Sequence, residues 1–331
     1  MLSLAESKGI RVLRVFAVYL VLAVLLWWAV RNAPLFEIRE TLRLLRPGQI
    51  ALLLAINALV ILCMSLRWWL VVRADAPRIP FIPFVGYRLS VFALSYFTPG
   101  PQVGGEPLQI LYLRSNHGLT FARAVSAVLI DKLLEFLGNF VFIGIGLFAI
   151  ARVGLLPANR SLGAAGWIAL TLLMIWPALH LVLLGRGRHP ISAILRALLG
   201  GSHRIKWFRL IVVSEYLAGT FVRRHPRALS SALAVSLVAW TGMGLEYLLM
   251  LGFLGIRLVP WEALAGLTAS LLAFLLPLPG GLGALEASQV LALGAFGYPA
   301  ATAISLTLLM RARDLLNGGL GAVLAGRGFG R

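Results

Sequence analysis

Long, almost uncharged runs of apolar residues constrain this chain more than any other feature of its sequence. Residues 15–30, 50–72, 162–184 and 228–254 are such runs. Each approaches the roughly 20 predominantly apolar residues that a helix needs to cross the hydrocarbon core of a bilayer. Charged residues make up 13% of the chain, against about 25% in an average soluble protein. The sequence therefore predicts an all-α, polytopic integral membrane protein.

The rest of the chain fits this class and predicts a single integral membrane domain over residues 1–331. Further spans are expected at 121–152 and 299–325. A basic amphipathic segment at 186–227 is expected on the cytoplasmic membrane surface. A cleavable signal peptide is the alternative interpretation of the run at 15–30. No convincing small-x-small cleavage site follows this run, which favours an uncleaved span.

The distribution of cations predicts the orientation in the membrane. With the N-terminus inside, the cytoplasmic segments hold 18 Lys and Arg and the outer segments hold 7. Because cationic loops are retained on the cytoplasmic side, both termini are predicted to be cytoplasmic, in the plasma (inner) membrane. A net charge of +18 in a soluble chain would suggest nucleic acid. Here the cations are scattered through short loops, which favours contact with anionic lipid and no nucleic-acid partner.

Several chemistries lack the residues that they require. The one cysteine, Cys63, excludes an internal disulfide and a cysteine-rich metal site. The five histidines never fall at i, i+4 spacing, and no glycine loop of the Walker or dinucleotide type is present. We therefore expect no metal site, no cofactor and no enzymatic activity.

Two pairs of short apolar segments are interrupted by proline and glycine. Residues 81–97 and 108–113 form the first pair, and residues 261–276 and 285–296 form the second. No segment of either pair reaches the length of an ordinary span. We therefore predict two re-entrant, broken-helix hairpins, with simple helix termination by the Pro-Gly breaks as the alternative.

The two hairpins match each other when the chain is shifted by 180 residues. Ten of 34 positions are then identical. The identities include the pairs Pro99 and Pro279, Gly100 and Gly280, and Glu106 and Glu286. Chance matching in an apolar chain is the alternative, but it does not easily produce these pairs. Three predicted spans separate the hairpins, so we expect an inverted duplication, with repeat one at about 80–150 and repeat two at about 260–326. Inverted repeats with broken helices are typical of transporters.

Ionisable residues lie inside the apolar runs, where each costs roughly 2.5–3.5 kcal/mol on insertion. They are Asp131, Lys132, Glu135, Glu246, Arg311, Arg313 and Asp314. The 180-residue shift places Asp131 opposite Arg311. An ion pair across the repeat is therefore predicted, with Glu135 and Arg313 as alternative partners. Such pairs either only hold helices together or also line a path for a ligand, and we favour the path.

The residues at the two breaks join this candidate path. Glu106 and Glu286 are either acids at helix N-termini or contacts for a cationic head group, and their apolar surroundings favour the second. Arg311 or Arg313 is expected to hold a lipid phosphate, and free N–H groups at the breaks can also bind phosphate oxygens. The predicted path residues are Pro99, Gly100, Gly105, Glu106, Asp131, Lys132, Glu135, Pro279, Gly280, Gly283, Glu286, Arg311, Arg313 and Asp314.

These residues resemble a known family, the transmembrane flippase-like domain of lysylphosphatidylglycerol synthases and its stand-alone members, some of which are associated with hopanoid loci. The resemblance covers residues 12–326. The motifs that carry it are Pro99-Gly100 with Glu106-Pro107, Asp131-Lys132 with Glu135, Pro279-Gly280 with Glu286, and Arg311. It implies movement of a lipid, typically an aminoacylated phospholipid, between leaflets.

The sequence departs from the family pattern in two ways that change the expected function. The soluble aminoacyl-transferase domain of the full synthases is absent from these 331 residues, so we expect no synthesis of lysylphosphatidylglycerol. Asp131-Lys132 stands where the family leads us to expect a Glu-Arg pair, a change that bears on head-group preference.

Three classes of function follow. The favoured one is a lipid flippase or transporter whose partners are anionic or aminoacylated phospholipids or a hopanoid. The second is a non-catalytic scaffold of a lipid biosynthetic assembly that docks through residues 186–227. The third is a membrane enzyme with Glu106 and Glu286 as acid and base, against which the missing nucleophile motif weighs. A homodimer and a lipid-synthesis enzyme partner are compatible with the sequence.

Overall fold

The computed structural model describes residues 35–98, 104–154, 164–199, 206–276 and 278–327. Every regular element within these ranges is a helix, as the apolar runs predict. The bounds are α2 Leu35–Arg43, α3 Pro47–Asp75, α4 Ile82–Phe97, α5 Glu106–His117, α6 Phe121–Arg152, α7 Ala164–Gly185, α8 Pro190–Leu199, α9 Lys206–Arg224, α10 Pro226–Phe253, α11 Pro260–Phe274, η2 Pro279–Gly281, α12 Ala284–Ala295 and α13 Ala300–Arg327.

Three of the described helices, α3, α6 and α10, are long and apolar enough to cross a membrane. The predicted span at 121–152 coincides with α6, and the span at 50–72 lies inside α3. The predicted span at 15–30 lies outside the described residues. The runs at 162–184 and 299–325 overlap α7 and α13, whose crossing of the membrane stays a prediction.

Local sequence signals explain where several helices begin and end. Pro47 and Pro226 occupy the first turn of α3 and α10, where the missing N–H of proline leaves no helical hydrogen bond unmade. The Thr120 side chain accepts a hydrogen bond from the Arg123 amide at the start of α6, which is the usual N-cap contact. Gly118, with φ of +66°, ends α5 in the left-handed conformation that glycine adopts at helix C-termini.

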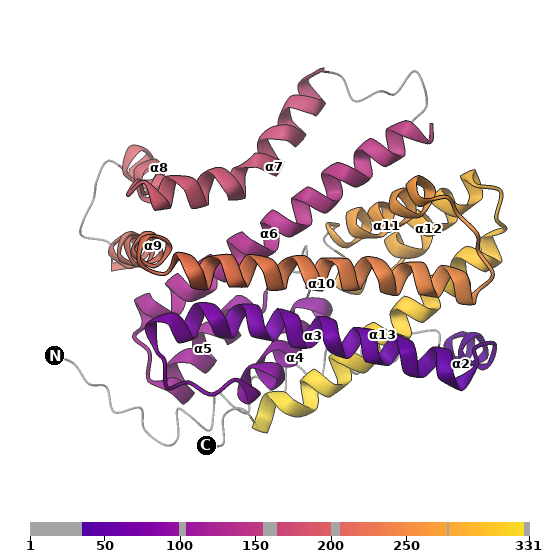
Figure 1. Ribbon diagram of the computed structural model, residues 1–331, viewed down its shortest axis with the longest axis horizontal. Coiled ribbons are helices and arrows are strands. Elements are labelled where there is room, and N and C mark those ends of the chain that lie inside the picture. Colours follow the sequence, from indigo (N-terminus) through magenta and orange to yellow (C-terminus); the bar gives the residue numbers. More distant parts are fainter. Residues whose placement is uncertain (1–34, 99–103, 155–163, 200–205, 277, 328–331) are drawn as a thin grey trace.

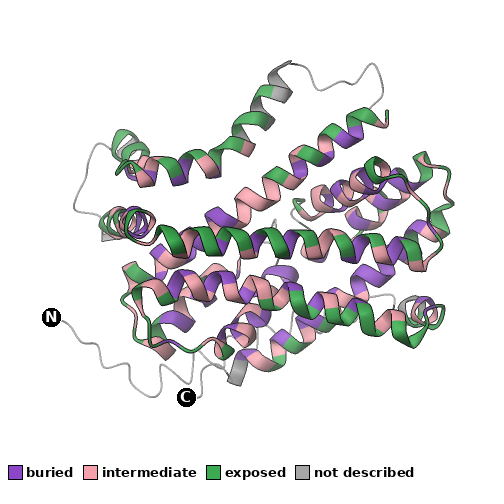
Figure 2. Ribbon diagram, in the orientation of Figure 1, coloured by how far each residue is buried: buried purple, intermediate pink, exposed green. Residues whose placement is uncertain are grey.

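Many large apolar side chains are exposed and several charged ones are buried, beside a core that is mostly apolar. Leu172 on α7 and Leu237 on α10 are 65% and 64% exposed, whereas Arg67 and Asp131 are 1% and 0% exposed. Figure 2 shows exposed residues along the outer faces of the long helices. Ionisable side chains in membrane segments face the bundle interior while apolar ones contact lipid. The fold therefore suits a bilayer as its solvent.

Helices from the two halves of the chain pack against each other. α3 lies along α10, α4 packs on α13, and α6 packs on α11 (Figure 1). The end of α3 meets the start of α10, where Asp75 Oδ1 lies 3.0 Å from His225 Nε2, so these two helices run in opposite directions. The six helices together surround the buried charges.

Each predicted hairpin consists of two short helices around a break. The first is α4 and α5, whose described break residues are Thr98, Gly104 and Gly105; the second is α11 and α12, with η2 between them. The second arm of the first hairpin runs over Glu106–His117 and is longer than the predicted 108–113. That the hairpins are re-entrant stays a prediction.

The basic segment at 186–227 contains the short helix α8 and the longer α9. α9 packs on α6 and α7, and its Glu215 is 1% exposed. The Glu215 carboxylate accepts hydrogen bonds from the amides of Ile191 and Ser192, at 2.8 and 2.7 Å. A carboxylate at a helix N-terminus is stabilised by free N–H groups and the helix dipole, so Glu215 fixes the start of α8. The position of this segment on the membrane surface stays a prediction.

Candidate functional site

Arg67 of α3 is the centre of a buried group of charges that we call the first ionic network. Its Nε donates to Asp131 Oδ1 at 2.7 Å, and its Nη2 donates to Glu135 Oε2 at 2.9 Å. Its Nη1 lies 3.5 Å from Ser236 Oγ of α10. Because the guanidinium is 1% exposed, it is stable only with charged partners and nearly complete hydrogen bonding. Arg67 thereby joins α3, α6 and α10.

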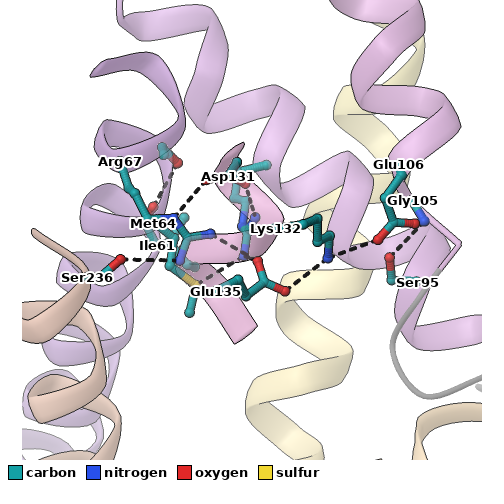
Figure 3. A network of polar contacts seen from close by, with 12 residues as sticks. Ile61, Met64, Arg67, Ser95, Gly105, Glu106, Asp131, Lys132, Glu135 and Ser236 are labelled. Carbon is teal, nitrogen blue, oxygen red and sulfur yellow. Dashed lines mark hydrogen bonds and ion pairs between the residues drawn. The ribbon is translucent and has the colours of Figure 1, made fainter. Parts of the chain in front are cut away.

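Lys132 and Arg88 extend the first ionic network to the first hairpin. Lys132 Nζ lies 2.9 Å from Glu106 Oε1 and 2.9 Å from Glu135 Oε1. Arg88 Nη2 donates to Glu135 Oε2 at 3.1 Å, and Arg88 Nη1 lies 3.7 Å from Asp131 Oδ2. Figure 3 follows the network from Ser236 to Glu106. The first hairpin is thus tied to α6 through a carboxylate that follows its break.

Arg311 of α13 holds the second hairpin in a similar way. Its Nε and Nη2 donate to the two oxygens of Glu286, at 2.8 and 3.0 Å. Its Nη1 donates to the carbonyl oxygen of Gly280 at 2.6 Å and to the hydroxyl of Tyr96 at 3.1 Å. Glu286 Oε2 in turn accepts from the Gly283 amide at 2.9 Å. This two-pronged pair binds both the break and the start of α12 to α13.

A third group, the acidic triad, comprises Glu246 of α10 with Arg313 and Asp314 of α13. Arg313 donates through Nε to Asp314 Oδ1 at 2.9 Å and through Nη1 to Glu246 Oε2 at 3.0 Å. Arg313 Nη2 lies 2.8 Å from the same Asp314 oxygen. The side chains of Glu246 and Asp314 are 2% and 5% exposed. One guanidinium therefore serves two buried carboxylates.

A cavity of about 360 Å³ is lined by part of the first ionic network and by the acidic triad, but not by Arg311 or Glu286. Charged lining residues come from α4 and α6 and from the acidic triad; they are Arg88, Lys132, Glu135, Glu246, Arg313 and Asp314. Aromatic and methionine side chains form much of the remaining wall, including Phe136, Phe140, Trp240, Phe274 and Met310. The cavity is therefore amphipathic, with ionic groups among apolar ones. Within the described ranges, no three His, Cys, Asp or Glu side chains are grouped so as to hold a metal ion.

Comparisons with known proteins decide the family. The family described as "Lysylphosphatidylglycerol synthase TM region" matches residues 14–321. The chain belongs to this family. This confirms the resemblance found in the motifs. A UPF0104 membrane protein of Pyrococcus horikoshii is 26% identical over 320 residues, which cover 87% of this chain and 88% of the relative. No solved structure shows a significant match. Family membership and the apolar helices together identify an integral membrane protein.

The predicted ion pair across the repeat is wrong. Asp131 contacts Arg67 and Arg88 rather than Arg311, and Arg311 contacts Glu286. Arg313 pairs with the two other members of the acidic triad. The physical reason is that α3 and α4 supply nearer cations for α6, while the donors of Arg311 are directed at the second break.

The structure brings only some of the other predicted path residues into the three groups. Glu106, Lys132 and Glu135 meet in the first ionic network. Gly105 donates its amide to Ser95 Oγ at 3.0 Å, and a Cβ there would lie 2.7 Å from the carbonyl oxygen of Val91. Pro279 belongs to η2. Pro99 and Gly100 lie outside the described residues.

The predicted path left out four members of the site, although Glu246 was already among the charges noted inside the apolar runs. Arg67, Arg88 and Glu246 interrupt apolar runs, so the cost of a charge in a membrane segment was a signal for each of them. Tyr96 contacts Arg311 from 215 positions away. Because tyrosine is uncharged, its presence in an apolar run does not indicate a functional residue.

Proposed function

We propose that this protein is a lipid flippase or transporter that moves a phospholipid between the two leaflets through the central cavity. The observation that carries the proposal is the lining, in which buried ionic groups stand among aromatic and methionine side chains. A phospholipid presents the same combination, a charged head group on an apolar body. Ionisable residues that face a cavity inside a membrane protein mark substrate paths.

Arg88 and Lys132 are proposed to receive the lipid phosphate. Both line the cavity, and their side chains are 13% and 14% exposed, unlike Arg67 at 1%. A guanidinium binds phosphate oxygens through two parallel hydrogen bonds. The sequence nominated Arg311 or Arg313 for this role. Arg311 does not line the cavity, and Arg313 is the single cation for the two carboxylates of the acidic triad. We therefore place the phosphate at Arg88 and Lys132.

An inverted duplication is proposed as the basis of alternating access. Two observations support it. The α4–α13 and α11–α6 pairs would be equivalent under a twofold axis that also relates α3 to α10. The carboxylate after each break pairs with a cation on the following long helix, Glu106 with Lys132 and Glu286 with Arg311. Rocking of one repeat against the other around a central site is how such transporters alternate. Both termini are proposed to lie in the cytoplasm, at the inner membrane.

Translocation in proteoliposomes tests the proposal. Purified protein is reconstituted with labelled phosphatidylglycerol or lysylphosphatidylglycerol, and the fraction of lipid reaching the outer leaflet is followed over time. We expect protein-dependent translocation, reduced about tenfold or more in Arg88→Gln because a hydrogen bond to a charged group contributes about 1.5–3 kcal/mol. Arg78→Gln removes an exposed arginine outside the cavity and should translocate normally. No translocation above protein-free vesicles would contradict the proposal.

A further inference from the structure

Taken together, the first ionic network, the Arg311–Glu286 pair and the acidic triad do not balance in charge. Three cations face three carboxylates in the first ionic network, and Arg311 faces Glu286 alone. The acidic triad has one cation, Arg313, for the two carboxylates of Glu246 and Asp314. With every group ionised, the excess of one negative charge lies in the acidic triad.

The neighbours of the acidic triad do not remove this excess. Across the cavity, Arg88 and Lys132 already contact Glu135. On α13 itself, Arg311 is committed to Glu286. The remaining titratable side chains of the lining are two tyrosines: Tyr96 contacts Arg311, and Tyr247 donates to Gln289 at 2.8 Å. From α3 and α11, the polar lining residues are the uncharged Asn57 and Ser270.

One carboxylate oxygen of the acidic triad is available to bind a further partner. Oε2 of the Glu246 carboxylate accepts from Arg313. Apart from the uncharged side chain of Asn57 next to this carboxylate, the buried Oε1 has no hydrogen-bond partner. An ionised carboxylate with an unpaired oxygen in a low-dielectric interior is strongly disfavoured. Two carboxylates that share one site do not both ionise readily, because each repels the charge of the other.

We propose that the acidic triad is a proton-binding site, with the proton held on the Glu246–Asp314 pair when the cavity contains no other cation. The proton comes from water that reaches the cavity, and it converts the triad from a charge of minus one to neutral. When the proton is on Glu246 Oε1, this oxygen becomes a neutral hydroxyl group instead of a charged oxygen without a partner. Because the two carboxylates contact the same guanidinium, they bind the proton as a pair rather than separately.

A proton and a cationic amino group compete for such a site. Either one neutralises the excess charge, and both together would leave an excess of one positive charge. The amino group of an aminoacylated phospholipid therefore displaces the proton when its phosphate lies at Arg88 and Lys132, and the proton returns to the water of the cavity. This exchange rests on the proposed function, whereas the proton site does not, and it would make lipid movement respond to a proton gradient.

Infrared difference spectroscopy of the purified protein in detergent tests the site. We expect the carbonyl stretching band of one protonated, buried carboxylic acid at neutral pH. The band should be lost in Glu246→Gln and in Asp314→Asn, and it should persist in Glu262→Gln, which changes an acid outside the cavity. Both triad variants are nearly isosteric and leave a neutral pair with Arg313, so melting temperatures should stay at or above that of the wild type. A missing band in the wild type, or a band unchanged in both triad variants, would overturn the proton site.

The same band tests the exchange separately. Lysylphosphatidylglycerol added to the wild type should abolish the band, and phosphatidylglycerol, which lacks the amino group, should leave it in place. Persistence of the band with both lipids overturns the exchange. Because the band without lipid does not depend on transport, the proton site can stand even if the flippase proposal fails.

Discussion

At the scale of single residues, buried arginines determine how the interior is held together. Arg67 contacts Asp131, Glu135 and Ser236 while it is 1% exposed. Arg311 contacts Glu286 and the carbonyl oxygens of the second break. The desolvation of a buried charge is offset only where partners and hydrogen bonds are nearly complete. Each guanidinium therefore fixes helices that are distant in the sequence.

A double-mutant cycle tests the pairing of Arg67 with Asp131. Arg67→Gln and Asp131→Asn each leave an uncompensated buried charge, which costs about 3–5 kcal/mol. We expect the double variant to be less destabilised than the sum of the two, with a coupling energy of at least about 1 kcal/mol in the free energy of unfolding. Arg311→Gln with Asp131→Asn is the control cycle and should be additive, because these side chains pair with other residues. Additivity in the first cycle would exclude the direct pair.

Sequence identified the charged residues of the site better than their partners. Asp131, Lys132 and Glu135 were predictable because a charge inside an apolar run needs a reason. The partner of Asp131 was not predictable, because Arg67 lies 64 positions away in the sequence and contacts Asp131 only as a result of helix packing. Pairing by the 180-residue shift assumed contact between equivalent positions, whereas the structure pairs Asp131 with Arg67 and Arg311 with Glu286.

At the scale of helices, small residues set how closely α13 approaches α4. A Cβ at Gly321 would lie 2.1 Å from the carbonyl oxygen of Leu89, and one at Gly318 would lie 2.8 Å from the ring of Phe97. Close backbone approach through small residues is a common mode of helix association in membranes. The residues of α13 thus divide between two kinds of contact. Arg311 and Asp314 reach the ionic groups, and the glycines contact α4.

Alanine substitutions on α13 test this close approach. Gly321→Ala places a methyl group against the α4 backbone, and overpacking of this kind costs about 1–3 kcal/mol. We expect a lower melting temperature for the purified protein. Gly319→Ala lies on the same helix with open space around its Cβ, and it should be neutral or stabilising by up to about 1 kcal/mol through helix propensity. Equal melting temperatures of the two variants would rule out tight packing at Gly321.

At the scale of the whole molecule, the two halves of the chain interleave around the central cavity. α3 with α10, α4 with α13 and α6 with α11 each join an element of the first half to one of the second. The positions of the helices followed from local apolar runs, so most were predictable. The pairing of helices depends on contacts between distant segments, which a single sequence does not report. The cavity could therefore not be predicted from the sequence, although most of its ionic residues could.

Blocking the cavity tests the central claim most directly. In a background that lacks Cys63, a single cysteine replaces either Asn139, which lines the cavity, or Val141, which is 42% exposed two positions along α6 and does not line it. Both proteins are labelled with a bulky thiol reagent and reconstituted, and phospholipid translocation is measured. We predict that labelling at position 139 stops translocation and that labelling at position 141 leaves it unchanged. Undiminished translocation with position 139 fully labelled would show that lipid does not pass through this cavity.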